Sequence, residues 1–249
     1  MARAGRPTLI PWLAAGDPFP PVERSLAQPN GLLAASRQLD ADALVRAYTQ
    51  GIFPWSAEND PVLWWSPDPR MVLFTGEFVA RRSLVRRIRS GLNAGRFEVR
   101  VDAGFVATMR ECAAPRPGQD GTWITGEMLD AYCELHERGL AHSVEVLAGG
   151  RRIGGLYCVA IGRMVFGESM FSLEPDASKI ALAALVQLLR LEEVPMLDCQ
   201  QKTSHLASLG ARAIARAQFC SHVAAAVRRP PIDWSRYRER AVTDLLRAY

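Results

Sequence analysis

The chain has little lysine. Thirty of its 249 residues are basic, and only Lys179 and Lys202 among them are lysines. A GC-rich genome is sufficient to explain this bias towards arginine. The formal net charge is +4 at pH 7, and a mild positive balance of this kind permits a nucleic-acid partner without requiring one.

The sequence also lacks the usual signatures of a disulfide framework or a metal site. Its five cysteines are widely spaced and include no C-x-x-C pair, which favours a reducing compartment, and we expect the cytoplasm. The four histidines form no H-x-x-x-H unit, and His136 and His142 lie six residues apart across a glycine, a poor spacing for ligands. We therefore expect no metal.

No apolar run approaches the roughly 18–20 residues that a membrane-spanning helix needs. The first residues are basic but no apolar segment follows them, so we expect no signal peptide. The chain contains neither G-x-G-x-x-G after a predicted strand nor G-x-x-x-x-G-K-[ST]. Dinucleotide and P-loop chemistry are therefore unsupported.

The hydrophobic fraction of 49% is enough to bury a core in one large or two smaller domains. Residues 1–40 are predicted to be irregular and residues 40–50 to be helical. Two stretches rich in proline and aromatic residues, 51–55 and 61–70, are predicted to be loops at a junction. The expected division is a small N-terminal domain, 1–70, and a larger domain, 71–249.

In the larger domain, the sequence predicts hairpin strands followed by alternating helices and strands. Asp102 and Asp176 are expected to cap helices, and Gly149-Gly150 is typical of a hairpin turn. The order favours an α+β fold, a mixed sheet flanked by helices. The predicted strands are 71–74, 97–101, 141–147, 152–161, 164–171, 196–199 and 212–216, and the predicted helices are 79–89, 102–112, 125–138, 177–191, 203–209, 217–228 and a polar helical tail after 231.

Glu168 lies in the apolar run Gly167-Glu-Ser-Met-Phe-Ser172. In a strand of period two it shares a face with Phe166 and Met170, an apolar setting that is costly for a carboxylate unless a ligand or partner uses it. A catalytic or binding role and a structural pairing with an arginine both remain open.

Asp198 and Gln200 are expected on one face at the end of another buried strand. An acid and an amide in this position could orient an amine or polarise a carbonyl, although Asp198 could instead cap the next helix. A Cys199 nucleophile paired with His205 is disfavoured because a buried strand cysteine usually behaves as a small hydrophobic residue.

Four tryptophans, Trp55, Trp64, Trp65 and Trp123, occupy predicted loops, and a dense arginine cluster occupies a predicted helix. Loop aromatics beside basic residues can stack unpaired bases. Core packing of the tryptophans and a solvated arginine face are the alternatives. The clustered arginines are Arg81, Arg82, Arg86, Arg87 and Arg89.

These pieces together resemble the bacterial leucyl/phenylalanyl-tRNA–protein transferases. The resemblance runs in order over about residues 29–216. Its motifs are Pro29-Asn-Gly-Leu-Leu-Ala34, Gly51-Ile-Phe-Pro-Trp55, Leu63-Trp-Trp-Ser-Pro-Asp-Pro-Arg70, Gly121-Thr-Trp-Ile-Thr125, Ala131-Tyr132, Leu135-His136, Ala141-His-Ser-Val-Glu145, Gly154-Gly-Leu-Tyr157, the Glu168 motif, Ala177-Ser-Lys179, Asp198-Cys-Gln200 and Ser208-Leu-Gly-Ala211. Departures from the family pattern are Ser36-Arg37-Gln38-Leu39, Cys158 and the chain beyond Phe219.

The resemblance implies a larger domain of the GNAT acyltransferase type. It also implies transfer of Leu, Phe or Met from aminoacyl-tRNA to proteins with N-terminal Arg or Lys, which marks them for N-end-rule degradation. The implied residues are Glu168, Asp198 and Gln200 for catalysis, Trp55 and Trp123 for the 3′-adenosine, and Leu156, Val165, Leu185 and Leu197 for the aminoacyl side chain.

The expected partners are therefore aminoacyl-tRNA and acceptor proteins, with no membrane, no cofactor and a monomeric enzyme. The aminoacyl ester is already activated, and proximity to the amine can supply much of the barrier lowering. The arginine helix is expected near the junction, where an acceptor stem could contact Arg81, Arg82, Arg86 and Arg87. Two other classes stay open: an acetyltransferase using acetyl-CoA, and an RNA-binding module without catalysis.

Overall fold

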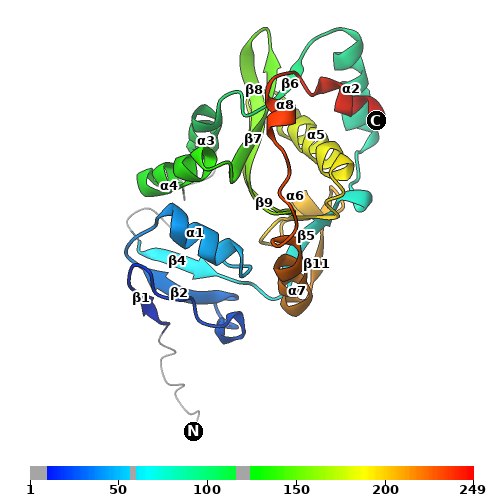
Figure 1. Cartoon of the computed structure of the whole chain (residues 1–249). Helices are drawn as coiled ribbons and strands as arrows, with labels where there is room; N and C mark the ends of the chain where they lie inside the picture. The colour runs from blue at the N-terminus through cyan, green and yellow to red at the C-terminus, as the bar shows by residue number, and fades with distance from the viewer. Residues whose placement is uncertain (1–9, 57–59, 116–123) are drawn as a thin grey trace.

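A small four-stranded sheet forms the N-terminal part of the molecule. The computed structural model describes residues 10–56, 60–115 and 124–249. Strands β1 (Trp12–Leu13), β2 (Leu32–Ser36), β3 (Phe53–Pro54) and β4 (Val62–Trp65) are ordered β1-β2-β4-β3, with β1 parallel to β2 and the other pairs antiparallel. Helix α1 (Ala41–Tyr48) lies beside this sheet, and a short 3-10 helix, η1 (Val22–Arg24), precedes β2 (Figure 1).

This sheet corrects the prediction that residues 1–40, 51–55 and 61–70 are irregular. Strand β2 is fully buried, and β4 places Trp64 and Trp65 in the core rather than in a loop. Proline is tolerated here because Pro54 lies on β3, at the edge of the sheet, where no further strand needs its missing N–H. The predicted helix at 40–50 is confirmed, and Asp40 caps it by accepting a bond from the Ala43 N–H.

The larger sheet has seven strands in the order β11-β5-β10-β9-β8-β7-β6. Its β10–β9 pair is parallel and its other pairs are antiparallel, so the sheet is mixed. This confirms the predicted α+β class. The strands are β5 (Arg70–Phe74), β6 (Glu98–Val101), β7 (Ala141–Ala148), β8 (Arg151–Ile161), β9 (Met164–Ser172), β10 (Met196–Asp198) and β11 (Arg212–Ile214).

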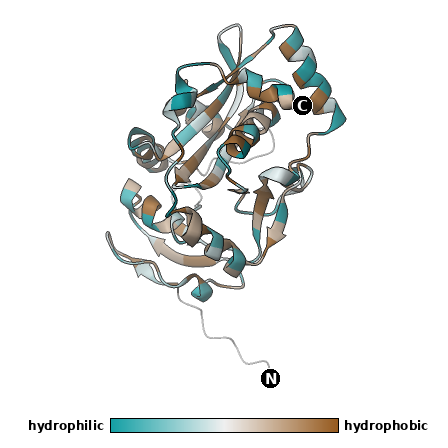
Figure 2. Ribbon diagram, turned by 45° about the vertical axis from the view of Figure 1, so that its right-hand side comes forward, coloured by the Kyte–Doolittle hydropathy of each residue, from teal (hydrophilic) through white to brown (hydrophobic). Residues whose placement is uncertain are grey.

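Helices cover both faces of this sheet (Figure 1). Helices α3 (Phe105–Ala113) and α4 (Gly126–Glu137) pack on one face, and the long α5 (Ala177–Leu191) packs on the other. In Figure 2, β4 and the central helix α5 are coloured mainly as hydrophobic. The remaining elements are η2 (Thr75–Glu77), α2 (Arg82–Asn93), α6 (Ser204–Ala207), α7 (Arg216–Ala226), α8 (Ser235–Arg238) and η3 (Thr243–Ala248).

Two apolar clusters stabilise the molecule, one on each face of the seven-stranded sheet. The first joins α3 and α4 to the small sheet through residues such as Tyr48, Trp64 and Tyr132. The second surrounds α5 and includes Trp234 and Leu246 from the C-terminal segment. The tail after residue 231 is therefore partly buried, so the prediction that it is polar is wrong, whereas its predicted helical character is confirmed in part by α8 and η3. In the described part of the chain, no helix is long and apolar enough to cross a membrane.

Two predicted helix caps are also corrected. Helix α3 begins at Phe105, and Asp102 instead adopts a positive φ and binds His142, Ser143 and Arg238. Asp176 precedes α5 as expected, but its side chain makes no cap bond and pairs with Lys179 and with an arginine of α2. In both cases a charged partner competes successfully for the carboxylate.

Candidate active site

The candidate site lies where strands β9 and β10 separate. The two strands pair at Leu197 with Val165 and at Asp198 with Phe166, and there β10 ends. Strand β9 continues to Ser172, so its later residues have no partner strand on that side. Glu168 is two residues past the last pair, and it faces the opening that this separation leaves.

Glu168 is held by neutral hydrogen-bond donors from two other parts of the chain. Its Oε2 accepts a bond from the Tyr132 hydroxyl at 3.0 Å, and its Oε1 accepts one from Gln200 Nε2 at 3.0 Å. The Tyr132 and Tyr48 hydroxyls are 2.5 Å apart, which extends the network from α4 to α1. Among the described residues Glu168 forms no ion pair, so the alternative of an arginine-paired structural glutamate is not what the structure shows.

The surroundings of Glu168 raise its pKa into the neutral range. Burial, which penalises the charged form, raises the pKa of Glu168 to about 7, and the negative charge of Asp198 acts in the same direction. The hydrogen bonds from the tyrosines and Gln200 oppose this shift only partly. A carboxyl group of this kind can both accept and return a proton near neutral pH.

Asp198 has a different environment, because it forms a buried ion pair with Arg70. Arg70 Nε and Nη2 donate to the two carboxylate oxygens at 2.8 and 2.6 Å, and both side chains are fully buried. The guanidinium lies between the rings of Phe53 and Phe219, at 4.6 and 4.5 Å from their centroids. The pair therefore joins strand β5 to the end of β10.

Gln200 is positioned by this ion pair. Its backbone N–H donates to Asp198 Oδ1 at 2.9 Å, and its φ of +60° turns the chain so that its amide reaches Glu168. The expectation that Asp198 and Gln200 share a strand face needs correction, since β10 ends at Asp198. The alternative helix-cap role is also not observed, because Thr203 caps α6 through the Leu206 N–H.

An apolar cavity of about 320 Å³ adjoins Glu168. Of the four predicted aminoacyl-pocket residues, Leu156, Leu185 and Leu197 line it, whereas Val165 is fully buried and is not among the lining residues. Sequence reasoning missed three further apolar lining residues. Leu182 could have been found from its i, i+3 relation to Leu185, while nothing local marks the other two, Met170 and Leu206.

Of the two tryptophans predicted to bind the adenosine, Trp55 lies within the described residues. Trp55 follows β3, is 42% exposed, and packs edge-on against Trp65 with centroids 5.7 Å apart. Trp65 Nε1 also donates to the Trp55 carbonyl at 2.7 Å, which fixes the backbone of Trp55. Trp123 lies outside the described residues.

Cys199 and His205 both line the cavity. Burial, aided by the charge of Asp198, raises the pKa of the Cys199 thiol, which disfavours the nucleophilic thiolate. Burial also lowers the pKa of His205, so this histidine is a poor source of positive charge for a thiolate. The expectation that Cys199 is not a nucleophile is consistent with this environment.

The clustered arginines lie on helix α2 or directly before it, and all five are exposed. Figure 1 places α2 at the end of the molecule remote from the four-stranded sheet, which corrects the expectation that these arginines flank the junction. Arg87 pairs with Asp176 at 3.0 Å, and Arg89 donates to the Tyr249 carbonyl. Arg86 and Arg87 line an open cavity of about 540 Å³.

The fold brings Asp102, His136 and His142 within 4.8 Å of one another, although the sequence spacing of the histidines argued against a shared site. Each of these three side chains already has hydrogen-bond partners within the protein. Asp102 binds His142, Ser143 and Arg238, and the two ring nitrogens of His142 contact Asp102 and the Gly139 carbonyl. His136 contacts the Ala141 carbonyl and stacks on a phenylalanine. This cluster fits a structural network that fastens the C-terminal segment to the sheet.

A carboxyl group with a neutral-range pKa beside an apolar cavity suits an enzyme that moves a proton while it holds an apolar group of its substrate. A family model described as leucyl/phenylalanyl-tRNA protein transferase matches residues 72–224, and one described as the N-terminal domain of that transferase matches residues 37–68. The chain belongs to this family.

Curated relatives that bear the name leucyl/phenylalanyl-tRNA–protein transferase cover almost the whole chain. The protein of Paraburkholderia phymatum is 55% identical over 242 residues, covering 96% of this chain and 98% of the relative. That of Burkholderia ambifaria is 57% identical over 230 residues and covers 91% of each. A solved GCN5-related N-acetyltransferase-like protein from Streptococcus suis overlaps 70% of this chain and 64% of its own, with 15% identity and a TM-score of 0.33.

Proposed function

We propose that the protein transfers leucine, phenylalanine or methionine from aminoacyl-tRNA to the α-amine of proteins that begin with Arg or Lys, and so marks them for N-end-rule degradation. The observation that carries the proposal is the position of Glu168 at an apolar cavity. Family membership supports the donor and the reaction class.

The cavity accounts for the choice of amino acid. Its lining is leucine-rich, and a Leu, Phe or Met side chain gains free energy by leaving water there. A polar side chain would lose hydrogen bonds on entering it. Differences of one methylene group in such pockets are worth about 1–3 kcal/mol. Trp55, with Trp123, stacks the terminal adenosine and so places the ester at the mouth of the cavity.

Glu168 takes the proton that the attacking amine must lose. The amine nitrogen bonds to the ester carbonyl carbon, the bond from that carbon to the ribose oxygen breaks, and the proton passes through Glu168 to the departing ribose hydroxyl. The ionised carboxylate also attracts the positive side chain of the acceptor. Because the aminoacyl ester is already activated, holding the amine and ester in register is the main task.

Asp198 and Gln200 position Glu168 rather than move the proton. Both oxygens of Asp198 accept hydrogen bonds from Arg70, so neither is free to take a proton from the amine. Asp198 fixes the Gln200 backbone, and the Gln200 amide then orients Glu168. One chain supplies all these groups, so we expect a monomer acting in the cytoplasm, where aminoacyl-tRNA is made. The division into domains at residue 70 remains a prediction.

The test uses purified protein, labelled Leu-tRNA and a protein with an N-terminal arginine, with and without acetyl-CoA. We expect label on the acceptor in both cases, and none when the acceptor's N-terminal residue is neutral. Acetylation that requires acetyl-CoA would instead identify an acetyltransferase. Tight tRNA binding without any transfer would identify a binding module.

A further inference from the structure

The separation of β9 and β10 leaves part of one strand edge without a partner strand. Strand β8 pairs with β9 along its length, whereas β10 pairs only with Val165 and Phe166. In the described part of the chain, no strand pairs with Gly167, Glu168 or Ser169 on the side of β10. An edge of this kind presents backbone N–H and C=O groups to which another chain can bond.

A β-bulge lies where the two strands separate. Tyr157 of β8 pairs with Ser169, and Cys158 pairs with Gly167, so Glu168 is one extra residue in β9. An extra residue bends its strand and interrupts the regular ladder. Strand β10 has ended at this level, and the chain continues into α6 rather than along β9. The bulge therefore places the catalytic candidate Glu168 at the start of the unpaired edge.

A cavity rather than a strand lies beside this edge. Gly167, Glu168 and Ser169 line the cavity of about 320 Å³ from the side of β9, and Thr203 and His205 line it from the side of α6. The three residues of β9 are half-buried, whereas the preceding part of the strand is buried. Solvent therefore reaches this part of β9, and there is space for a ligand next to it.

The gap between β9 and α6 connects the two faces of the sheet. The leucines of the cavity belong to the apolar cluster around α5, on one face. Glu168 accepts a bond from Tyr132 of α4, which packs on the other face. The apolar side chain of the donor is attracted to the leucines. The amine that loses its proton must come to Glu168, so the chain that carries this amine begins beside the unpaired edge.

Strand β10 sets the direction in which such a chain can extend. Because β10 occupies the edge of β9 as far as Phe166, a chain that begins at Glu168 can follow the edge only towards Ser172. It then runs parallel to β9 and continues the line of β10, which is itself parallel to β9. At about 3.3 Å per residue, about five residues of the chain cover the edge from Glu168 to Ser172.

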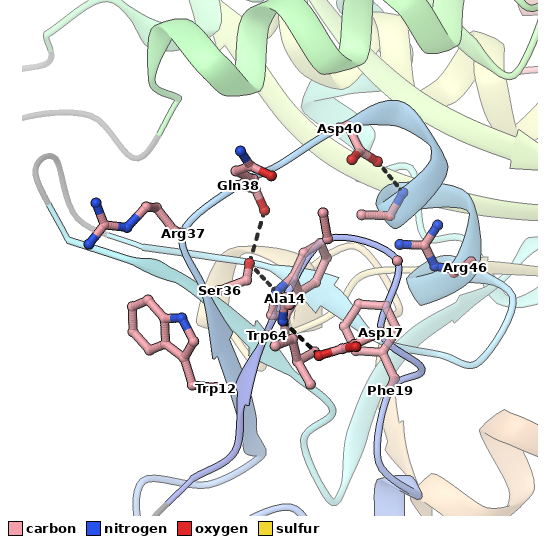
Figure 3. Close-up of a pocket in the computed structure, with 14 residues that line it drawn as sticks. Trp12, Ala14, Asp17, Phe19, Ser36, Arg37, Gln38, Asp40, Arg46 and Trp64 are labelled. Carbon is pink, nitrogen blue, oxygen red and sulfur yellow. Dashed lines mark hydrogen bonds between the residues drawn. The ribbon is translucent and has the colours of Figure 1, made fainter.

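The cavity on the small N-terminal part is less suited to the acceptor. It measures about 180 Å³, and Asp17, Arg37, Asp40 and Arg46 are among its lining residues (Figure 3). Charges of both signs favour neither a basic nor an acidic group. Asp17 and Asp40 are also engaged, since each accepts a bond from a backbone N–H three residues away.

We propose that the acceptor polypeptide binds as an additional parallel strand on the edge of β9, with its α-amine at Glu168. The inference rests on the proposed transfer to protein N-termini and specifies how the acceptor is held. Main-chain hydrogen bonds of this type are available to any amino-acid sequence, which suits an enzyme whose acceptors share only their first residue. The basic side chain of that residue selects the acceptor, and the edge of β9 holds the chain that follows.

The experiment measures transfer from Leu-tRNA to Arg-led decapeptides in which an ester oxygen replaces one backbone N–H, at residue 3, 4, 7 or 8. Alternate residues of a strand bond to a given neighbour, so the KM should rise at residue 3 or at residue 4 but not at both. We expect a rise of about three- to tenfold, with kcat unchanged. Residues 7 and 8 lie beyond the end of β9, so esters there are the matched controls and leave the KM unaltered.

Glu168→Gln provides a second measurement. The proposed contact is made by the backbone, so the ratio of KM between the ester and amide peptides should persist in this slower variant. Loss of the ratio in the variant overturns the inference, because the effect of the ester then depends on the Glu168 carboxylate. Equal KM values for the esters at residues 3 and 4, raised or not, overturn it as well. Failure of wild type to label even the unmodified decapeptide is instead a failure of the proposed function.

Discussion

Arg70 and Asp198 form a two-point ion pair from which solvent is fully excluded. The pair connects the first strand after the small sheet with the strand that ends at the candidate site. It also explains why an acid at the end of a buried strand is tolerated, which the sequence alone left open between a catalytic and a capping role. Buried pairs of this type are strongly destabilised when one partner is removed.

Asp198→Ala should therefore affect stability and activity together. Loss of the carboxylate leaves a buried guanidinium unpaired, and we expect the free energy of unfolding to fall by about 3–5 kcal/mol. Transfer should fall by orders of magnitude because Gln200 loses its anchor. Urea denaturation and single-turnover transfer from Leu-tRNA measure the two effects.

The double variant Arg70→Met, Asp198→Leu is the control for that experiment. It removes both charges, so it should recover much of the lost stability without recovering transfer. Recovery of transfer along with stability would mean that the ion pair has no role in positioning Gln200.

The pH dependence of transfer should report Glu168. Its raised pKa of about 7 means that the carboxylate is lost as the pH falls through 7, so transfer should fall below that pH. The acceptor α-amine, with an ordinary pKa of about 7.7–8.0, loses its free base over a similar range. In wild type, the logarithm of kcat/KM should therefore rise with a slope near two at low pH. Glu168→Gln should be slower and retain a slope near one, and an unchanged slope would exclude Glu168 as the proton acceptor.

The raised pKa of Glu168 also makes the stability of the protein depend on pH. Between the ordinary carboxyl pKa of 4.5 and about 7, the folded protein holds a proton that the unfolded chain has released. Stability should therefore decrease as the pH rises through this window, and then level off. Glu168→Gln should remove the decrease, which thermal denaturation at pH 5 and pH 8 would reveal.

The size of the apolar cavity should set the preference between leucine and phenylalanine. Leu185→Ala enlarges it, so kcat/KM for Phe-tRNA relative to Leu-tRNA should rise about tenfold, within the 1–3 kcal/mol range of such pockets. Val165→Ala is the matched control, because Val165 is buried beside the cavity without lining it. It should lower stability and leave the preference unchanged.

Trp55 should bind the terminal adenosine by stacking. Base stacking on an aromatic ring is worth about 1–3 kcal/mol, so Trp55→Ala should weaken binding of an aminoacyl-adenosine analogue by about one to two decades. Trp123→Ala should have a comparable effect. Leu191→Ala, which removes an exposed apolar side chain at the end of α5, is the control. Analogue binding that survives in both tryptophan variants would place the adenosine elsewhere.

The sequence predicted the larger sheet well because most of its strands are apolar runs and its helices carry clear apolar faces. The small sheet was missed because β1 and β3 have two residues each, too few to show a period, and because prolines lie at the end of β3 and on both sides of β4. At the site, the sequence indicated Glu168, Asp198 and Gln200 but not Arg70, which is 128 residues from its partner. The sequence assigned neither Tyr48 nor Tyr132 to the site, since only the fold brings α1 and α4 to the same carboxylate.

Helix α2 is the strongest candidate for contact with the tRNA acceptor stem, although it lies far from the small sheet (Figure 1). Its arginines are exposed, and contacts between arginine and phosphate release counterions and make binding sensitive to salt. The variant that tests this neutralises Arg81, Arg82 and Arg86 and leaves Arg87, which pairs with Asp176, in place. We expect a higher KM for full-length Leu-tRNA. The plot of log binding constant against log salt concentration should also be less steep, by up to the contribution of about three phosphate contacts.

The KM for a minimal aminoacyl-adenosine donor should not change in this variant, because that donor has no acceptor stem. A control variant that neutralises Arg24, Arg110 and Arg240 removes the same net charge from three other exposed positions. It should keep the wild-type salt slope, since general attraction to the protein contributes little beyond a Debye length of about 8–10 Å. If both triple variants flatten the slope equally, the effect belongs to net charge. If neither does, the acceptor stem crosses another face of the molecule, and the arginines of α2 are a solvated surface.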